Sequence, residues 1–307
     1  MLTKEAKNKN NFIKNRFYYN SARSAFIDLL RNLNLKSDEL ILFPSYIGQS
    51  PIEGSGVFDP VRKLNLSYMF YKINDDLSVN FDDIKFIIKE FKIKILFVIH
   101  YFGFVQKQIE EISEFCKKNK IILIEDCAHS LSSGINNIKA GTFGDYALFS
   151  IHKICASLAG GILQINNNSK SINQDNQLKI EIDDLLLFLN SDIESISNKR
   201  RINFEYYLKN LKETILYEIF YKTLPPYTVP LNFPILIKNF DRYEIYKKLL
   251  EMEVPCVSLW HTLIKEINTD LYPISKKISS SILNLPVHQD ITKEDMDYII
   301  EKLNFLK

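Results

Sequence analysis

The 307-residue chain has few cysteines and no strong charge of one sign. Its four cysteines, Cys116, Cys127, Cys155 and Cys256, are widely spaced and form no CxxC pair. This spacing argues against a structural zinc site and against a disulfide framework, so we expect reduced thiols in the cytoplasm. The formal net charge is +2 with both signs interspersed, and no long-range field favours nucleic acid or an anionic membrane as a partner.

Long hydrophobic runs are also missing. The apolar runs at 95–99 and 185–189 are far too short to span a bilayer. Residues 1–16 are rich in lysine and asparagine and have no apolar stretch like that of a secretory signal. We therefore expect a soluble, cytoplasmic protein with no membrane partner.

Glycine is scarce and unevenly distributed. All nine glycines fall between Gly48 and Gly161. Glycine is favoured where the backbone takes unusual dihedral angles or approaches a ligand closely. We expect this stretch to contain both turns and residues of the functional site.

The first half of the chain alternates amphipathic helices with short apolar strands. We expect helices at 24–33, 81–91 and 106–119, and strands at 39–43, 95–99 and 121–125. This alternation is typical of parallel strands joined by crossover helices. It predicts an α/β fold with a mostly parallel sheet and helices on both faces.

The pattern changes after residue 161. We expect a turn at 166–169, a largely helical stretch at 183–219, a strand at 233–237 and a helix at 242–252. Thr292 can cap the last helix, with Asp295 at the capping-box position.

The proline-bearing stretch 224–230 breaks the helices and resembles a linker. The chain is slightly longer than one core usually organises. We expect a large domain at 1–228 and a small C-terminal α/β domain at 229–307.

Lys153 lies between an acidic strand end, marked by Asp126, and the pair Gly160-Gly161. A lysine amine can form a Schiff base with an aldehyde cofactor, and an aspartate can hold the pyridine nitrogen of such a cofactor protonated. The combination is typical of a pyridoxal-phosphate site. Each residue on its own also has an ordinary interpretation: Lys153 as a solvated lysine, and Asp126 as a helix cap or turn residue.

Further motifs are spread over nearly the whole chain. They are Asn20-Ser21-Ala22-Arg23-Ser24-Ala25, Leu42-Phe43-Pro44-Ser45-Tyr46, His100-Tyr101-Phe102-Gly103, Asp126-Cys127-Ala128-His129 and Leu285-Pro286-Val287-His288. With Lys153, they resemble the DegT-type (DegT/DnrJ/StrS) family of pyridoxal-phosphate-dependent sugar aminotransferases. The resemblance implies the aspartate-aminotransferase-like fold of type I, with the cofactor in the large domain. It also implies a homodimer with the active site at its interface.

The resemblance implies roles for individual residues. Lys153 takes the position of the Schiff-base lysine, whose neutral amine would shuttle a proton; desolvation would favour that form. Asp126 would pair with the pyridinium nitrogen. His129 falls near the phenolic oxygen of the cofactor, to which a ring nitrogen can donate, although a lone histidine can equally be structural.

The phosphate would be held by Ser150 and by the backbone around Ala22 and Arg23, where a helix begins. The family more usually has Ser-Gly-Thr at 21–23, and Ser150 lies closer to Lys153 than in many members. Ser150 can also be a turn residue, and Arg23 a charge on a helix face.

Gly48 stands where many members of the family place an aromatic ring that stacks on the cofactor. Tyr46, Tyr101 and His100 are candidate replacements, although tyrosines are more often packing residues. Trp260, His261 and His288 can approach the substrate from the small domain, but we interpret them as structural.

The resemblance implies transfer of an amino group, from glutamate, to a keto group of a nucleotide-linked sugar, for amino-sugar or surface-polysaccharide biosynthesis. A first alternative is the dehydratase branch of the family, in which histidine replaces the lysine, because His152 adjoins Lys153. The distance to Gly160-Gly161 favours Lys153. A second alternative is a non-catalytic sensor or assembly member, because the region between Gly161 and Pro230 is shorter than the family leads us to expect.

Overall fold

The computed structural model describes residues 15–155, 157, 159–167 and 172–306. Within these residues seven strands form one large sheet in the order β1-β9-β8-β5-β4-β2-β3. They are β1 Arg16–Tyr19, β2 Leu40–Pro44, β3 Tyr68–Tyr71, β4 Ile93–Ile99, β5 Ile122–Asp126, β8 Tyr146–Ser150 and β9 Gly161–Ile165. Strands β3, β2, β4, β5 and β8 run parallel, and β9 and β1 are antiparallel to their neighbours. The predicted α/β fold with a mostly parallel sheet is confirmed.

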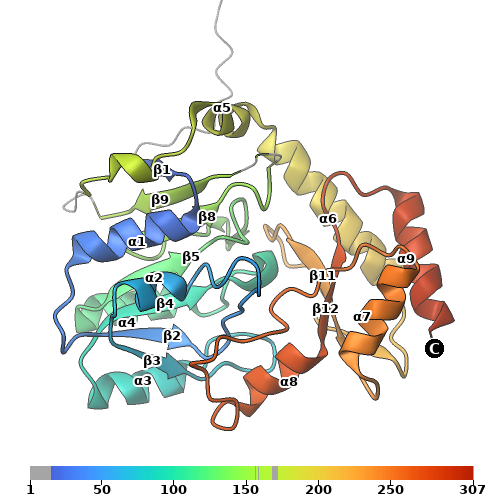
Figure 1. Ribbon diagram of the computed structural model, residues 1–307, viewed down its shortest axis with the longest axis horizontal. Coiled ribbons are helices and arrows are strands. Elements are labelled where there is room, and N and C mark those ends of the chain that lie inside the picture. Colours follow the sequence, from blue (N-terminus) through green and yellow to red (C-terminus); the bar gives the residue numbers. More distant parts are fainter. Residues whose placement is uncertain (1–14, 156, 158, 168–171, 307) are drawn as a thin grey trace, which may run out of the picture.

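Helices connect the parallel strands. They are α1 Ala22–Leu33, α2 Asp59–Lys63, α3 Phe81–Glu90 and α4 Ile109–Asn119. Figure 1 draws α1 and α2 in front of the sheet and α4 behind it. Strand β4 is covered on both faces, since all but one of its residues are buried, which explains its unbroken apolar sequence.

Helix α4 begins three residues later than predicted. Gln106 does not start the helix because its side chain is bound to two other segments. Its Nε2 donates to the carbonyl oxygens of Leu77 and Ile99 at 3.0 and 2.8 Å. Its Oε1 accepts the Val79 N–H at 3.0 Å, so Gln106 closes the junction between β4 and the loop before α3.

A second, three-stranded antiparallel sheet has the order β10-β11-β12. Its strands are β10 Tyr217–Ile219, β11 Asn232–Ile237 and β12 Ile282–Pro286, and the later helices are α5 Ile182–Asn190, α6 Ile193–Asn210, α7 Arg242–Glu251, α8 Pro273–Ser281 and α9 Lys293–Phe305. The predicted strand at 233–237, the helix at 242–252 and the Thr292–Asp295 capping box are confirmed.

The prediction of one largely helical stretch over 183–219 is wrong at its end. Asp192 caps a new helix by accepting the Ser195 N–H, which separates α5 from α6. Residues 217–219 then form β10, because Tyr217 and Ile219 are buried on one face and the backbone pairs with β11. The turn predicted at 166–169 lies partly outside the described residues.

The small sheet has its own core, which includes Phe204 and Tyr207 of α6 as well as Tyr217 of β10. These residues precede the boundary predicted near 228, which stays a prediction. The proline-bearing stretch and the residue after it are hydrogen-bonded to segments that follow strands of the large sheet. The Gly134 N–H donates to the Tyr227 carbonyl and the Leu231 N–H to that of Phe102, both at 2.8 Å.

The remaining elements are short: β6 Gly134–Ile135, β7 Ile138–Lys139, and the 3-10 turns η1 Tyr101–Gly103 and η2 Asn176–Leu178. Among the described helices, none combines the length and the apolar character that crossing a membrane requires.

Candidate active site

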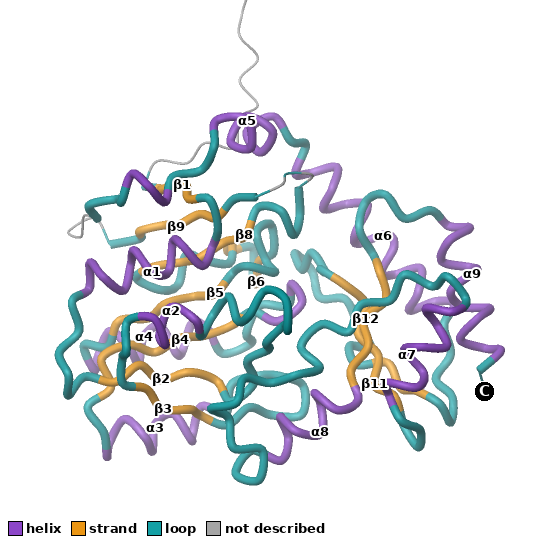
Figure 2. Tube along the Cα trace, in the orientation of Figure 1, coloured by secondary structure: helices purple, strands orange, loops and turns teal. Residues whose placement is uncertain are grey.

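A cleft of about 850 Å³ opens at the carboxyl ends of the parallel strands. Ligands of open α/β sheets usually bind at this edge, and the volume is within the range of small-molecule pockets. Figure 2 shows loops crossing between this edge and the small sheet. The cleft brings together all six residues predicted for the site: Ala22, Arg23, Asp126, His129, Ser150 and Lys153.

Lys153 lies in the turn that follows β8, and its Nζ is 2.8 Å from Nε2 of His129. The Phe102 N–H donates to Nδ1 of the same imidazole at 3.2 Å. In a neutral imidazole whose Nδ1 accepts a hydrogen bond, the proton is on Nε2. The Nε2–H group can donate only to an atom with a free lone pair. The contact therefore requires a neutral Lys153 amine.

The electrostatics of this pair agree with that assignment. Burial, and then the charge of Lys153, lower the pKa of His129 well below its ordinary value. Burial lowers the pKa of Lys153, against the opposing effect of the carboxylates Asp126 and Glu53. Both groups are held toward their uncharged forms.

Asp126 is the last residue of β5 and its side chain is buried. Its Oδ1 accepts the Ala128 N–H at 2.9 Å. Burial raises the pKa of Asp126, although this hydrogen bond, Lys153 and His100 act in the opposite direction. A carboxylate in such surroundings would be stabilised by a bound cation with an N–H donor.

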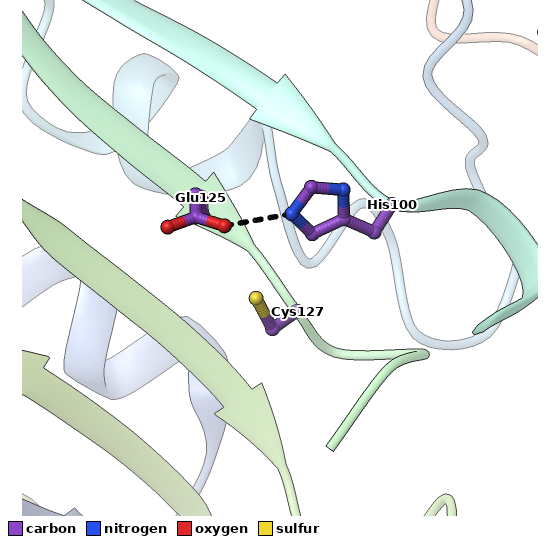
Figure 3. A group of neighbouring side chains, drawn as sticks. All are labelled: His100, Glu125 and Cys127. Atoms are coloured by element: carbon purple, nitrogen blue, oxygen red, sulfur yellow. Dashed lines mark hydrogen bonds and ion pairs between the residues drawn. The ribbon is translucent and has the colours of Figure 1, made fainter. Parts of the chain in front are cut away.

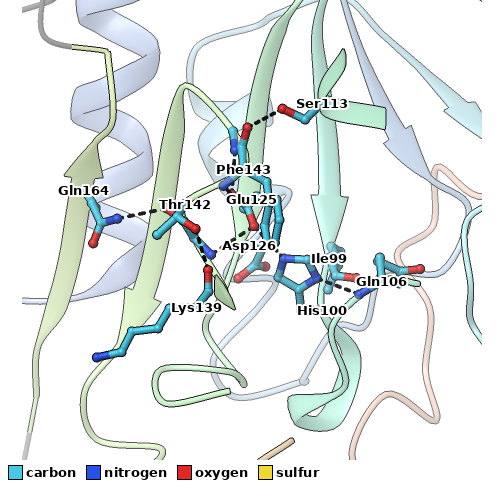
Figure 4. Close-up of polar contacts among 12 residues, drawn as sticks. Ile99, His100, Gln106, Ser113, Glu125, Asp126, Lys139, Thr142, Phe143 and Gln164 are labelled. Atoms are coloured by element: carbon cyan, nitrogen blue, oxygen red, sulfur yellow. Dashed lines mark hydrogen bonds and ion pairs between the residues drawn. The ribbon is translucent and has the colours of Figure 1, made fainter. Parts of the chain in front are cut away.

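The end of β5 is fixed by Glu125, which precedes Asp126 and points to the opposite face of the strand. Its carboxylate accepts the backbone N–H groups of Gly141, Phe143 and Gly144 at 2.9, 2.8 and 2.6 Å. Nε2 of His100 is 2.9 Å from Oε2 of the same carboxylate. Figure 4 shows this network joining β5, the end of β4 and the loop before β8.

Possible metal-ligating atoms of His100, Glu125 and Cys127 lie within 4.8 Å of one another. Figure 3 shows these three side chains. The lone pairs that a metal would need are already engaged, because Glu125 accepts four donors and Nδ1 of His100 accepts the Gln106 N–H at 3.2 Å. Burial raises the pKa of the Cys127 thiol. We interpret the cluster as support for the strand that carries Asp126.

Helix α1 begins at the cleft, with Ser21 as its N-cap accepting the Ser24 N–H at 3.1 Å. The helix start lies directly against β9, since a Cβ atom added to Gly161 would come within 2.2 Å of the Ala22 nitrogen. Arg23 donates to the Glu53 carbonyl, and its Nη1 is 3.8 Å from Oδ2 of Asp59. The positive end of the α1 dipole therefore borders the cleft.

Ser150 ends β8, and its Oγ is 3.3 Å from Nδ1 of His152. His152 is exposed, whereas the Lys153 amine contacts the buried His129. Of these two neighbours, Lys153 is the one whose functional group reaches the ring beside Asp126.

Two residues that the sequence led us to interpret as structural, Trp260 and His261, line the cleft. Tyr46 and Tyr101, two of the proposed replacements for a ring at Gly48, are buried behind it, and both pack against Trp260. The signal in the sequence was faint: Trp260 is the single tryptophan of the chain.

The fold is shared with a solved aminotransferase and a solved sugar dehydratase. The Helicobacter pylori aminotransferase PseC, involved in the biosynthesis of pseudoaminic acid, superimposes with a TM-score of 0.79 at 18% identity, covering 95% of this chain and 86% of that one. The Escherichia coli GDP-4-keto-6-deoxy-D-mannose-3-dehydratase, solved with bound hydrated PLP, has a TM-score of 0.74 at 18% identity, covering 94% and 88%.

The chain belongs to the DegT/DnrJ/EryC1/StrS aminotransferase family, whose model matches residues 18–174 and 190–304. It is 25% identical over 202 residues to the UDP-4-amino-4,6-dideoxy-N-acetyl-beta-L-altrosamine transaminase of Helicobacter pylori, covering 62% of this chain and 50% of that protein. The matched segments span 18% to 65% of the lengths of these curated relatives.

Proposed function

We propose that this chain is a pyridoxal-phosphate-dependent aminotransferase that moves an amino group to a keto group of a nucleotide-linked sugar. The observation that carries the proposal is the contact of 2.8 Å between Nζ of Lys153 and Nε2 of His129, in the same cleft as the buried carboxylate of Asp126. The residues present fit the cofactor: an uncharged amine for its aldehyde, an anion for its ring nitrogen and a helix N-terminus for its phosphate.

When bound, the cofactor supplies an electron-accepting ring that stabilises negative charge developing on the substrate carbon. Asp126 would accept the pyridine N–H. The positive charge of the ring would stabilise the Asp126 carboxylate, whose charged form burial disfavours. His129 would orient the Lys153 amine through Nε2, because its own ring is fixed by the Phe102 N–H.

Lys153 would take a proton from the substrate carbon at Nζ and return one to the cofactor side. This task requires a free lone pair, which burial and the His129 contact both favour. The α1 N-terminus at Ala22 and Arg23, together with Ser150, would bind the phosphate group.

For the substrates, we infer glutamate as the amino donor and a keto-sugar nucleotide as the acceptor. Support comes from the family and from relatives named as nucleotide-sugar transaminases. We also infer a cytoplasmic homodimer with its active site at the interface. Sedimentation of the purified protein tests whether it is a dimer.

Reconstitution with pyridoxal phosphate tests the cofactor and the lysine together. The wild-type protein should turn yellow, and borohydride should fix the cofactor covalently to the peptide that contains Lys153, as read by mass spectrometry. Lys153→Ala should lose the adduct, whereas Lys107→Ala, at an exposed lysine paired with Asp76, should keep it. An adduct on other lysines alone would contradict the proposal.

Transamination is tested next on the same sample. Glutamate should abolish the yellow absorbance and release 2-oxoglutarate in equal amount. A panel of keto-sugar nucleotides should then restore the colour for the true acceptor. Colour that glutamate leaves unchanged would count against glutamate as the donor.

The dehydratase alternative rests on His152, which also lines the cleft. The contact between Lys153 and His129 favours the aminotransferase, because the lysine amine contacts the buried His129 whereas His152 is exposed. Cofactor binding with no lysine adduct would favour the dehydratase.

The non-catalytic alternative rests on the region after Gly161, where the family match is interrupted over 175–189, a segment containing η2 and most of α5. Failure of the purified protein to bind pyridoxal phosphate would favour this alternative.

A further inference from the structure

Trp260 lies in the space beside Gly48. A Cβ atom added to Gly48 would lie 3.0 Å from Cγ and Cδ2 of the indole and 3.1 Å from the Trp260 Cα. Such contacts are tighter than a packed core accepts without movement. The indole thus fills the volume that a side chain at position 48 would need, and both residues line the cleft.

The backbone holds Trp260 there from both ends. The Gln49 N–H donates to the Thr262 carbonyl at 2.8 Å, and the Ile264 N–H to that of Ile47 at 3.0 Å. At the other end, Val257 exchanges backbone hydrogen bonds of 2.9 and 3.0 Å with Asn284 of β12. The segment 257–264 therefore crosses from the small sheet to the rim of the cleft.

The conformation of Trp260 is uncommon for its residue type. Its φ of 64° lies in the left-handed region, where bulky residues are rare and persist only when the surroundings impose it. The hydroxyl of Tyr46 donates to the Trp260 carbonyl at 2.9 Å. The surroundings thus dictate the direction of the indole.

The indole joins an aromatic group that reaches the catalytic pair. It stacks on the Tyr46 ring at 5.7 Å and 23°, and meets Tyr101 edge-on at 5.4 Å and 86°. It also meets the imidazole of His129 at 5.8 Å and 76°. His129 in turn contacts Lys153 at 2.8 Å, so the indole borders the atoms to which the cofactor would bind.

We propose that Trp260 is a cofactor-binding residue that supplies the aromatic surface for the pyridine ring, and that position 48 is glycine because the indole occupies the space beside it. The inference rests on the proposed function. A planar cationic ring gains free energy from contact with an aromatic surface, and indole is the best such surface. The ring thus comes from the C-terminal segment instead of from the strand end at Gly48.

The test compares dissociation constants for pyridoxal phosphate, from visible absorbance and circular dichroism of the bound cofactor. Trp260→Ala should weaken binding about ten-fold, and Trp260→Phe by less, because it keeps an aromatic ring. The double variant Gly48→Phe with Trp260→Ala should regain part of the affinity. Tyr243→Ala, at an exposed aromatic residue of α7, is the matched control and should bind as the wild type does.

A second readout uses apoprotein, because the single tryptophan reports its own surroundings. Gly48→Phe alone should displace the indole, shift its emission to longer wavelength and weaken cofactor binding. If Trp260→Ala fails to fold, the measurements on Gly48→Phe test the role of Trp260. Unchanged emission and affinity in Gly48→Phe would overturn the proposal.

Failure of the proposed function is distinguishable from failure of this inference. A wild-type protein that forms no adduct at Lys153 would contradict the proposed function, and the inference would fall with it. A wild-type protein that forms the adduct, with a folded Trp260→Ala variant of equal affinity, would overturn the role of Trp260 alone.

Discussion

At the scale of single residues, the chemistry depends on which group carries the proton between His129 and Lys153. The Phe102 N–H fixes the tautomer of His129, and the tautomer requires a neutral amine. The motif Asp-Cys-Ala-His indicated a residue near the cofactor. It did not indicate the lysine as the partner of His129, because that contact joins the turn after β5 to the turn after β8.

Removing the imidazole should shift the pH profile of adduct formation. His129→Ala takes away the N–H that stabilises the neutral amine, so the pKa of Lys153 should rise. A hydrogen bond is worth about 1 kcal/mol, which corresponds to a shift of roughly 0.7 pH unit toward higher pH. The measurement is the rate of borohydride-trapped adduct at Lys153 across a pH series.

His129→Gln is the matched control for this shift, because its amide retains an N–H donor. It should react with a profile between those of the wild type and His129→Ala. Identical profiles for all three proteins would show that the imidazole does not act on the lysine.

The same residue should make the stability of the apoprotein depend on pH. Burial lowers the folded-state pKa of His129, so the unfolded chain binds a proton that the folded protein does not. Its contribution is complete above the unfolded pKa of about 6.5 and is lost as the pH falls through the folded value. For one proton the slope is at most about 1.4 kcal/mol per pH unit.

Urea unfolding between pH 5 and pH 8 measures that slope. His129→Gln should flatten it without abolishing it, because burial also lowers the pKa of His261. Equal slopes in the wild type and His129→Gln would contradict this account.

At the scale of elements, the start of α1 is placed by its contact with β9. A Cβ atom at position 161 would lie 2.2 Å from the Ala22 nitrogen and 2.4 Å from the Ser21 carbonyl oxygen. Both neighbours are backbone, so Gly161→Ala should force the helix start away from the sheet at a cost of about 1–3 kcal/mol. Gly56→Ala is the control, because no atom lies within 4 Å of its added Cβ.

Urea unfolding of the two variants gives the difference in stability. The displacement should also weaken pyridoxal-phosphate binding in Gly161→Ala, because the α1 N-terminus borders the cleft. If Gly161→Ala were as stable as Gly56→Ala, close contact between α1 and β9 would not be what requires glycine.

The sequence predicted those helices and strands whose pattern of apolar residues is local. Strand β4 and helices α1 and α3 have local signals, an unbroken apolar run or an amphipathic period, and were predicted within two residues. The start of α4 was missed because Gln106 bonds to Leu77 and Ile99, which a local pattern does not report. Strand β10 was missed because three residues reveal their pairing only beside β11.

At the scale of the whole molecule, the site depends on contacts between segments far apart in the chain. The motifs carrying Lys153 and Asp126 were proposed from the sequence, because cofactor chemistry requires these residue types. Trp260 was interpreted there as structural, because its position against Gly48 follows from the backbone pairing of its segment with Asn284 and with the loop after β2. The segment 257–264, between β11 and β12, therefore contributes to a cleft that strand ends of the large sheet define.

Arg200 of α6 makes a second connection of this kind. Its buried guanidinium donates to the carbonyl oxygens of Lys153, Leu231 and Pro230 at 3.2, 3.1 and 3.5 Å. Burial lowers its pKa to about 10. The same helix contributes Phe204 and Tyr207 to the core of the small sheet, so α6 links that core to the turn bearing Lys153.

Arg200→Met should loosen this link, because it fills similar space while leaving three carbonyl groups without their donor. Loss of hydrogen bonds to buried groups predicts a decrease of about 2–4 kcal/mol in the free energy of unfolding. The rate of adduct formation at Lys153 should fall as well, since the turn is no longer held, while Lys209→Met, at an exposed position of the same helix, should change neither quantity. Arg200→Lys retains a charge but not the planar fork of donors, so it should recover only part of the loss. Destabilisation with an unchanged rate of adduct formation would assign Arg200 to folding alone and remove it from the support of the active site.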